Sequence, residues 1–223
     1  MVKRFIRKFI PSFLRRMADR LLFPGSANYW DKRYLRRGNS GAGSYGRLAE
    51  FKAEVLNRFV SEQNIQTVIE FGCGDGHQLS LACYPHYIGI DVSSTAVSLC
   101  QKRFSTAEDL KFLTLFDYLG KEECRPVAEL SLSLDVIYHL VENDVFDRYM
   151  ATLFDASTRY VIIYSSNDDR PYQAGHHVRH RKFQDWIEKN RTDWTLLRHI
   201  PNKYPYEEGN DDTSFADFFF YER

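Results

Sequence analysis

Residues 67–76, TVIEFGCGDG, constrain the fold of this chain more than any other stretch. A short β-branched run meets three glycines at alternate positions, Gly72, Gly74 and Gly76. Such a run bounded by glycine is typical of a buried strand. Glycines let the backbone turn sharply and let a ligand lie against the main chain. The pattern predicts a strand, a ligand-binding turn and then the start of a helix, although a tight turn without a ligand would also account for the glycines.

Strand-like and helix-like runs alternate after this turn. The strand-like runs are residues 67–72, 87–91, 110–115, 128–137 and 159–165, and the clearest helix-like runs are 94–104 and 144–154. After Lys182 the pattern changes to one helix (183–190) and two strands (193–200 and 214–223). Alternating units predict a parallel sheet with helices on both faces. We therefore expect an α/β fold with a Rossmann-like, doubly wound, seven-stranded and mainly parallel sheet that ends in an antiparallel strand.

Asp91 is the second residue that points to a ligand, because it closes the run YIGID 15 residues beyond Gly76. An acid at the tip of the second strand can accept both hydroxyl protons of a ribose bound across the first turn. A helix cap is its alternative role, which Ser93 or Ser94 could fill equally well. The glycines do not match the G-x-G-x-x-G pattern of dinucleotide enzymes, which disfavours an NAD-dependent enzyme.

The first 20 residues carry a charge of +6, and the rest of the chain carries −6. Apolar residues at helical spacing predict a basic amphipathic helix over residues 1–25, kinked by Pro11. Residues 1–22 could lie on an anionic membrane, bind nucleic acid or dock on a partner protein. Their Phe and Ile content favours the membrane over nucleic acid. The four cysteines form no C-x-x-C pair, so we expect reduced thiols, no structural metal, and a cytoplasmic protein on the inner face of the cytoplasmic membrane.

Residues 70–76 and Ile90–Asp91 resemble the first two motifs of the class I S-adenosylmethionine-dependent methyltransferases, and the resemblance extends over residues 29–165. Glu129 stands where that family usually has Asp. The resemblance implies S-adenosylmethionine as cofactor and S-adenosylhomocysteine as product. It also implies which residues contact each part of the cofactor. The methionine part would be lined by Glu70, Gly72, Cys73, Gly74, Asp75 and Gly76, and the ribose would be bound by Asp91 beside Val92. The adenine would be bordered by Asp117 and Tyr118, and the region near the sulfonium by Ser133, Leu134 and Asp135.

The segments YWDKRY and NSGAGSYGRLAEFKAEVLN resemble methyltransferases encoded with bacterial surface-polysaccharide assembly. This narrower resemblance implies a glycan or sugar-phosphate acceptor. Residues 26–223 would form the methyltransferase domain, with a lid over 26–46 and an acceptor-side segment over 166–223. In the lid, Tyr29, Trp30, Arg33 and Tyr34 are expected near the cofactor, because aromatic faces attract a sulfonium cation. Ordinary core packing is the alternative for these rings.

His139 is the proposed base, because it follows the fourth strand and its ordinary pKa of about 6.5 suits proton uptake at neutral pH. Tyr138 is the second candidate. Residues 176–182, within the run GHHVRHRKF, are rich in His and Arg. This cluster is expected to be a polar loop near the acceptor, with Arg179 or Arg181 available for phosphate or carboxylate. Two other functions stay open: a small-molecule or lipid-headgroup methyltransferase at the membrane, and a cofactor-binding scaffold without turnover.

Overall fold

The computed structural model describes residues 25–120, 124–170 and 177–223. In this part of the chain, seven strands form one sheet at the centre of the molecule. The strands are β1 (Thr67–Phe71), β2 (His86–Asp91), β3 (Leu110–Thr114), β4 (Ala128–Leu134), β5 (Ser157–Ser165), β6 (Thr195–Ile200) and β7 (Asp217–Glu222). The helix and the membrane contact expected for residues 1–25 lie outside the described residues and stay predictions.

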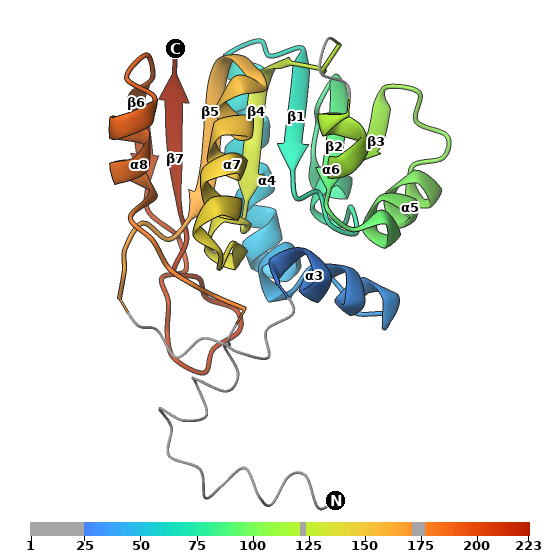
Figure 1. Cartoon of the computed structure of the whole chain (residues 1–223), viewed down its shortest axis with the longest axis horizontal. Helices are drawn as coiled ribbons and strands as arrows, with labels where there is room; N and C mark the ends of the chain where they lie inside the picture. Colours follow the sequence, from blue (N-terminus) through green and yellow to red (C-terminus); the bar gives the residue numbers. More distant parts are fainter. Residues whose placement is uncertain (1–24, 121–123, 171–176) are drawn as a thin grey trace, which may run out of the picture.

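The strand order is β3-β2-β1-β4-β5-β7-β6 (Figure 1). Strands β1 to β5 pair in parallel, whereas β7 lies antiparallel between β5 and β6. This arrangement confirms the predicted doubly wound sheet with its antiparallel final strand. The chain runs outward from β1 to β3 and then crosses back to β4. In open α/β sheets, a ligand binds where the order reverses, beyond the carboxyl ends of the strands.

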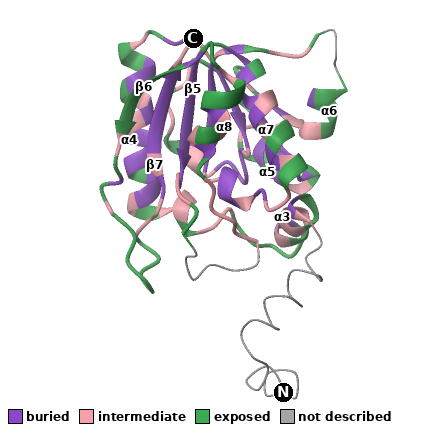
Figure 2. Cartoon of the chain, turned by 60° about the vertical axis from the view of Figure 1, so that its left-hand side comes forward, coloured by how far each residue is buried: buried purple, intermediate pink, exposed green. Residues whose placement is uncertain are grey.

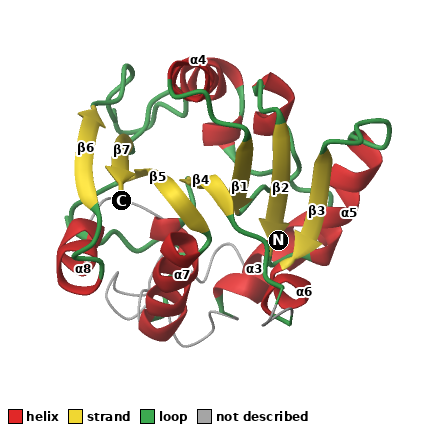
Figure 3. Ribbon diagram, turned by 90° about the horizontal axis from the view of Figure 1, so that it is seen from above, coloured by secondary structure: helices red, strands yellow, loops and turns green. Residues whose placement is uncertain are grey.

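Helices cover both faces of the sheet (Figure 3). Helices α4 (Gly46–Glu62) and α5 (Ser94–Arg103) contribute to one apolar cluster, and α6 (Leu115–Leu119), α7 (Asn143–Asp155) and α8 (Phe183–Asn190) contribute to a second. The central strands are buried between these layers, whereas β6 is mostly exposed (Figure 2). Helix α3 (Ser26–Leu35) lies at the carboxyl edge of the parallel strands, close to α5.

The helix expected after Gly76 is reduced to one 3₁₀ turn, Gln78–Leu81. The chain has little room for a longer helix, because Pro85 precedes β2 and the connection from Phe71 to His86 is short. No helix in the described part of the chain is long and apolar enough to cross a membrane.

Three expected strand boundaries were also wrong, two of them for a local reason. The strand expected over 128–137 stops at Leu134, because Asp135 adopts a left-handed backbone with φ of 60°. Leu115 opens α6 instead of closing β3, because the Thr114 hydroxyl caps that helix by accepting from the Asp117 amide. The last strand begins at Asp217, three residues later than expected.

Candidate active site

A cavity of about 450 Å³ opens at the reversal point of the sheet, beyond the carboxyl ends of β1, β2 and β4. Its size falls within the range of small-molecule and cofactor sites. Most residues that the sequence singled out line it: Trp30, Tyr34, Glu70, Gly72, Cys73, Gly74, Asp75, Asp91, Val92, Leu134, Asp135 and His139. Residues of α3, α4, α6 and α7 complete the walls. The cavity therefore joins the glycine turn, the lid and the end of β4.

The glycine turn has a backbone that other residues rarely adopt, with φ of 90° at Gly72 and 58° at Gly74. A side chain at either position would also collide with its surroundings. A Cβ atom on Gly72 would lie 2.4 Å from the Val136 side chain, and one on Gly74 would lie 2.4 Å from the Ser40 hydroxyl. Glycine is required here both by conformation and by close approach.

Asp91 lies buried under this turn at the tip of β2. One carboxylate oxygen accepts from the Gly74 amide at 3.0 Å, and the other accepts from the Ser93 amide at 2.8 Å. Burial raises the pKa of Asp91 to about 6, although these backbone hydrogen bonds oppose the shift. The helix cap that Asp91 could have supplied comes instead from the Ser93 hydroxyl, which accepts from the Ala96 amide.

Glu70, the residue before the last in β1, is a second buried carboxyl group. Its Oε2 atom accepts a hydrogen bond of 2.7 Å from the Tyr87 hydroxyl. Burial raises the pKa of Glu70 to about 7, and the Tyr87 hydrogen bond and the charge of Lys52 only partly oppose this shift. Near neutral pH the cavity wall therefore holds a carboxyl group that can gain or lose a proton.

Replacing Glu70 by glutamine is expected to stabilise the protein at high pH but not at low pH. Because the folded-state pKa is raised from 4.5 to about 7, ionisation of Glu70 destabilises the native state increasingly as pH rises through that window. The stability of Glu70→Gln relative to wild type should rise by on the order of 3 kcal/mol between about pH 5 and about pH 8. Urea unfolding at both pH values measures this difference in the free energy of unfolding. Glu62→Gln, at the exposed end of α4, is the control, and a gain independent of pH would show that Glu70 is not shifted.

The lid is attached to the glycine turn through Asp75. Its Oδ2 atom accepts from the Tyr45 hydroxyl at 2.6 Å and from the Ser40 amide at 3.1 Å. Burial alone would raise the pKa of Asp75, but hydrogen bonds from Tyr45, His77 and Ser40 outweigh it and lower the pKa. Asp75 thus lines the cavity as an ionised group whose oxygens bind the lid.

The start and the middle of α3 are also fixed to the domain. The Ser93 hydroxyl donates to Asp31 at 2.7 Å. The Ser26 hydroxyl, at the start of α3, donates to the His139 carbonyl at 2.7 Å and to the Glu142 carboxylate at 2.6 Å. Gly25 occupies the cap position. The lid lies against the cavity, and Trp30 and Tyr34 form part of the cavity wall.

Asp135 forms a buried ion pair that the sequence did not reveal. Its Oδ2 atom lies 2.6 Å from Nζ of Lys52, a side chain of α4 that is only 1% exposed. The Tyr138 hydroxyl donates to the other carboxylate oxygen at 2.7 Å. Lys52 stands in the middle of an amphipathic helix, so its sequence context resembles that of a solvated lysine. Its role follows only from the left-handed turn at Asp135, which aims the carboxylate at α4.

His139 projects into the cavity as a neutral imidazole. Its Nδ1 atom lies 3.1 Å from the His177 carbonyl, which can only accept, so Nδ1 carries the proton and Nε2 keeps a lone pair. Burial lowers the pKa of His139 to about 4, although the bond to the carbonyl opposes the shift. Trp30 packs edge-on against the ring at 4.7 Å. The arrangement fixes the tautomer that can accept a proton.

Seven of the sequence-predicted residues do not line the cavity: Tyr29, Arg33, Gly76, Asp117, Tyr118, Ser133 and Tyr138. Asp117 is exposed and accepts from the Thr114 hydroxyl, while the Tyr118 hydroxyl donates to the Pro126 carbonyl. Arg33 holds the lid loop through Asn39, and Tyr29 stacks on His177. At the α6 side the cavity is lined by Leu115 and Leu119 instead.

Helix α7 contributes four residues that sequence reasoning missed: Val145, Arg148, Tyr149 and Thr152. The Tyr149 hydroxyl donates to the Ser133 hydroxyl at 2.7 Å and also lies 3.1 Å from the Phe71 carbonyl, and so connects the ends of β1 and β4. Their spacing of three and four residues places them on one helix face. That spacing was visible in the sequence, but it is equally typical of core packing.

The arginines of the 176–182 cluster bind the main chain. Arg179 donates to the Val141 carbonyl at 2.9 Å, and Arg181 donates to the carbonyls of Leu140 and Val141 at 3.0 and 2.9 Å. Burial lowers the pKa of Arg181 to about 10. These bonds attach the segment after β5 to the loop after β4. Neither arginine lines the cavity, and a phosphate-binding role for them stays a prediction. Among the described residues, no group of three or more His, Cys, Asp or Glu side chains could hold a metal ion.

No known family model matches the chain, and no curated protein matches its sequence. Solved structures with the same fold are numerous. Magnesium protoporphyrin IX methyltransferase from Synechocystis PCC 6803, with bound S-adenosylhomocysteine, aligns with a TM-score of 0.64 at 13% identity over 88% of this chain and 97% of its own.

Two further structures are comparable. The N-methyltransferase NodS from Bradyrhizobium japonicum WM9, in complex with S-adenosylhomocysteine, gives a TM-score of 0.63 at 13% identity over 89% of this chain and 98% of its own. The methyltransferase domain of a bacterial Hen1 protein gives a TM-score of 0.59 at 16% identity over 77% of this chain and 96% of its own. At such low identity these likenesses show the fold, which is that of class I S-adenosylmethionine-dependent methyltransferases.

Proposed function

We propose that the chain binds S-adenosylmethionine in the 450 Å³ cavity and transfers its methyl group to an acceptor hydroxyl. The observation that carries the proposal is the buried Asp91 carboxylate, bonded to the Gly74 amide beneath a turn of left-handed glycines. Two of the similar folds described above are solved with S-adenosylhomocysteine bound, which supports the same ligand here.

The residues present fit this cofactor. A ribose needs hydroxyl acceptors, and Asp91 supplies carboxylate oxygens at the wall of the cavity. A sulfonium is a cation, and the carboxyl groups of Glu70 and Asp135 and the rings of Trp30 and Tyr34 line the same space. An adenine ring needs apolar walls, which Leu115 and Leu119 provide. When bound, the cofactor supplies a methyl group on a sulfur that is already an activated leaving group.

The protein's own contribution is alignment and removal of a proton. The lid and the fixed glycine turn hold the reactants and exclude water, which converts methyl transfer into an oriented local step. His139 takes the acceptor proton on Nε2, because its Nδ1 hydrogen is held by the His177 carbonyl. Tyr138 is less suited as a base: burial raises its pKa well above the ordinary value, and its hydroxyl already donates to Asp135.

A sugar hydroxyl remains the proposed acceptor. A sugar hydroxyl reacts without a neighbouring cation, whereas a phosphate would need one. The described lining of the cavity contains Lys52, which is paired with Asp135, and Arg148, which is paired with Asp144. Arg179 and Arg181 lie outside it and donate to main-chain carbonyls. The charges at the site therefore favour the uncharged sugar hydroxyl over the sugar phosphate. Radiolabelled methyl transfer onto lipid-linked glycans, nucleotide sugars and phospholipids would identify the acceptor, and transfer to none of them would favour the scaffold.

Replacing Asp91 by alanine is expected to weaken binding of S-adenosylhomocysteine by about 1.5–3 kcal/mol, the usual contribution of hydrogen bonds to a charged group. Isothermal titration calorimetry measures the affinity directly and needs no acceptor. Asp109→Ala removes an exposed carboxylate that is paired with His86 outside the cavity, and should bind like wild type. Equal affinity in Asp91→Ala and wild type would show that Asp91 does not hold the ribose.

A further inference from the structure

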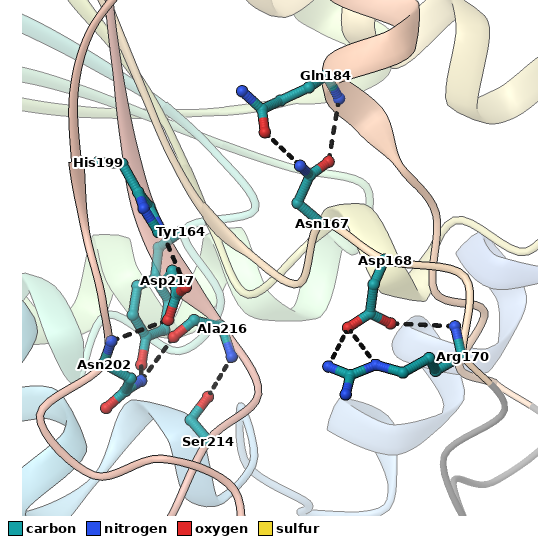
Figure 4. A network of polar contacts seen from close by, with 10 residues as sticks. All are labelled: Tyr164, Asn167, Asp168, Arg170, Gln184, His199, Asn202, Ser214, Ala216 and Asp217. Atoms are coloured by element: carbon teal, nitrogen blue, oxygen red, sulfur yellow. Dashed lines mark hydrogen bonds and ion pairs between the residues drawn. The ribbon is translucent and has the colours of Figure 1, made fainter.

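A second pocket, of about 540 Å³, lies at the same edge of the sheet. It is bordered by the residues that follow β5, by the carboxyl end of β6 and by the start of β7 (Figure 4). Its polar lining includes Asn167, Asp168, Arg170, Gln184, His199 and Asp217. The cavity proposed for the cofactor lies over β1, β2 and β4, so the two spaces are distinct.

The polar side chains of this pocket are held in place by one another (Figure 4). The side-chain amides of Asn167 and Gln184 are hydrogen-bonded together. Asp168 accepts from the Arg170 guanidinium at 2.7 and 3.1 Å. His199 pairs with Asp217 at 2.9 Å. Such mutual bonding fixes the directions of donors and acceptors before a ligand arrives, which lowers the entropic cost of binding.

The chemistry of the lining selects a neutral ligand with several hydroxyl groups. A carboxylate only accepts hydrogen bonds and a guanidinium only donates them, whereas a hydroxyl can do both. Arg170 is paired with Asp168, and Asp217 is paired with His199, so the charged groups of the lining already have partners of their own. A charged ligand would have to displace one of these partners, whereas a neutral ligand would not. Hydroxyl groups can satisfy both kinds of partner at once.

Aromatic rings supply the remaining wall. Tyr206, Phe215 and Phe219 line the pocket beside the carboxylates and amides. The faces of a sugar ring carry C–H groups, whereas its rim carries hydroxyls. Flat apolar side chains therefore suit its faces, and the carboxylates and amides suit its rim. This combination of partners distinguishes a sugar from a small polar ion.

Packed rings lie between the second pocket and the first cavity. Phe215 packs edge-on against Tyr138 at 4.9 Å, and the Tyr138 hydroxyl donates to Asp135 at the cavity wall. We propose that the second pocket binds a sugar ring of the methyl acceptor other than the ring that is methylated. This inference rests on the proposed function, and it narrows the acceptor to a glycan of at least two sugar units.

The test is an NMR titration of isotope-labelled protein with the methyl α-glycosides of glucose, galactose and mannose. At least one glycoside should shift the side-chain amide signals of Asn167 and Gln184, whereas inorganic phosphate should not. Asp168→Asn should weaken the affinity for that glycoside roughly tenfold or more, which is the loss expected for a charge-assisted hydrogen bond. Asp217→Asn should do the same and keeps the test valid if the first variant does not fold. Asp211→Asn, in an exposed loop outside the pocket, is the matched control.

Titration of the same variants with S-adenosylhomocysteine separates this inference from the proposed function. Unchanged cofactor affinity together with weakened glycoside binding supports both. Cofactor binding without any glycoside shift, or with shifts that phosphate reproduces, overturns the sugar site alone. Glycoside shifts in a protein that does not bind S-adenosylhomocysteine overturn the acceptor role. Equal glycoside affinity in Asp168→Asn, Asp217→Asn and wild type places the sugar elsewhere and overturns the inference.

Discussion

Replacing His139 by alanine is expected to lower the turnover of methyl transfer by roughly 10²–10⁴-fold, the usual contribution of a positioned general base. His139 lines the cavity, and its Nε2 atom keeps a lone pair because the His177 carbonyl holds the hydrogen on Nδ1. Affinity for S-adenosylhomocysteine should stay nearly unchanged, since the proposed ribose contact comes from Asp91. The rate is measured with the acceptor that gives the highest wild-type turnover in the radiolabel screen.

The pH profile gives an independent check on the same residue. Because burial lowers the pKa of His139 to about 4, the imidazole is neutral and able to accept a proton from neutral pH down to about that value. The loss of rate caused by His139→Ala should therefore stay the same as pH drops through about 6.5, where an ordinary histidine titrates. The comparison is made between variant and wild type at each pH, because Glu70 and Asp91 in the same cavity have pKa values of about 7 and about 6. His86→Ala, an exposed histidine outside the cavity, should leave turnover unchanged. Normal turnover in His139→Ala would return this residue to a structural role.

Replacing Lys52 by methionine is expected to destabilise the protein by about 3–5 kcal/mol, the usual result of removing one partner of a buried ion pair. Methionine preserves the length of the side chain, so the loss reports the charge rather than the packing. Asp135 would be left with the Tyr138 hydroxyl and no cation, and its side chain is only 13% exposed. Urea unfolding gives the free energy, and Lys111→Met on the exposed side of β3 should change it little.

A double variant tests whether the loss comes from the unpaired carboxylate. In Lys52→Met with Asp135→Asn no charge is left behind, and asparagine tolerates the left-handed backbone at position 135. The double variant should be more stable than Lys52→Met alone. If Lys52→Met loses less than about 1 kcal/mol, or if the double variant recovers nothing, the ion pair does not stabilise the fold.

The sequence predicted what depends on neighbouring residues. Residues 67–76 predicted a strand and a turn, and the positive φ at Gly72 and Gly74 is one that glycine readily adopts. The alternation of strand and helix patterns predicted the doubly wound sheet and its antiparallel end, because the side-chain period decides which element forms. Asp91 was found for the same reason, since the tips of consecutive parallel strands meet at one edge.

The sequence failed where a residue's partner is distant in the chain. The bonds of Arg179 and Arg181 to the carbonyls of residues 140–141 were not predicted. Asp75 was expected to face a ligand, and its Oδ2 atom holds Ser40 and Tyr45 of the lid. These partners lie about 30 to 40 residues away, and no local pattern records which group a polar side chain meets.

Sequence alone thus determined the class of fold, the position of the cavity at the strand tips and most of its lining, because those follow from backbone period and from glycine's conformational freedom. Tertiary structure alone decided the chemical state of the site. The tautomer and low pKa of His139 come from burial and from the His177 carbonyl, and the Lys52–Asp135 pair comes from the packing of α4 on β4. Protonation and pairing depend on solvent exclusion and distance, which exist only once the chain has folded.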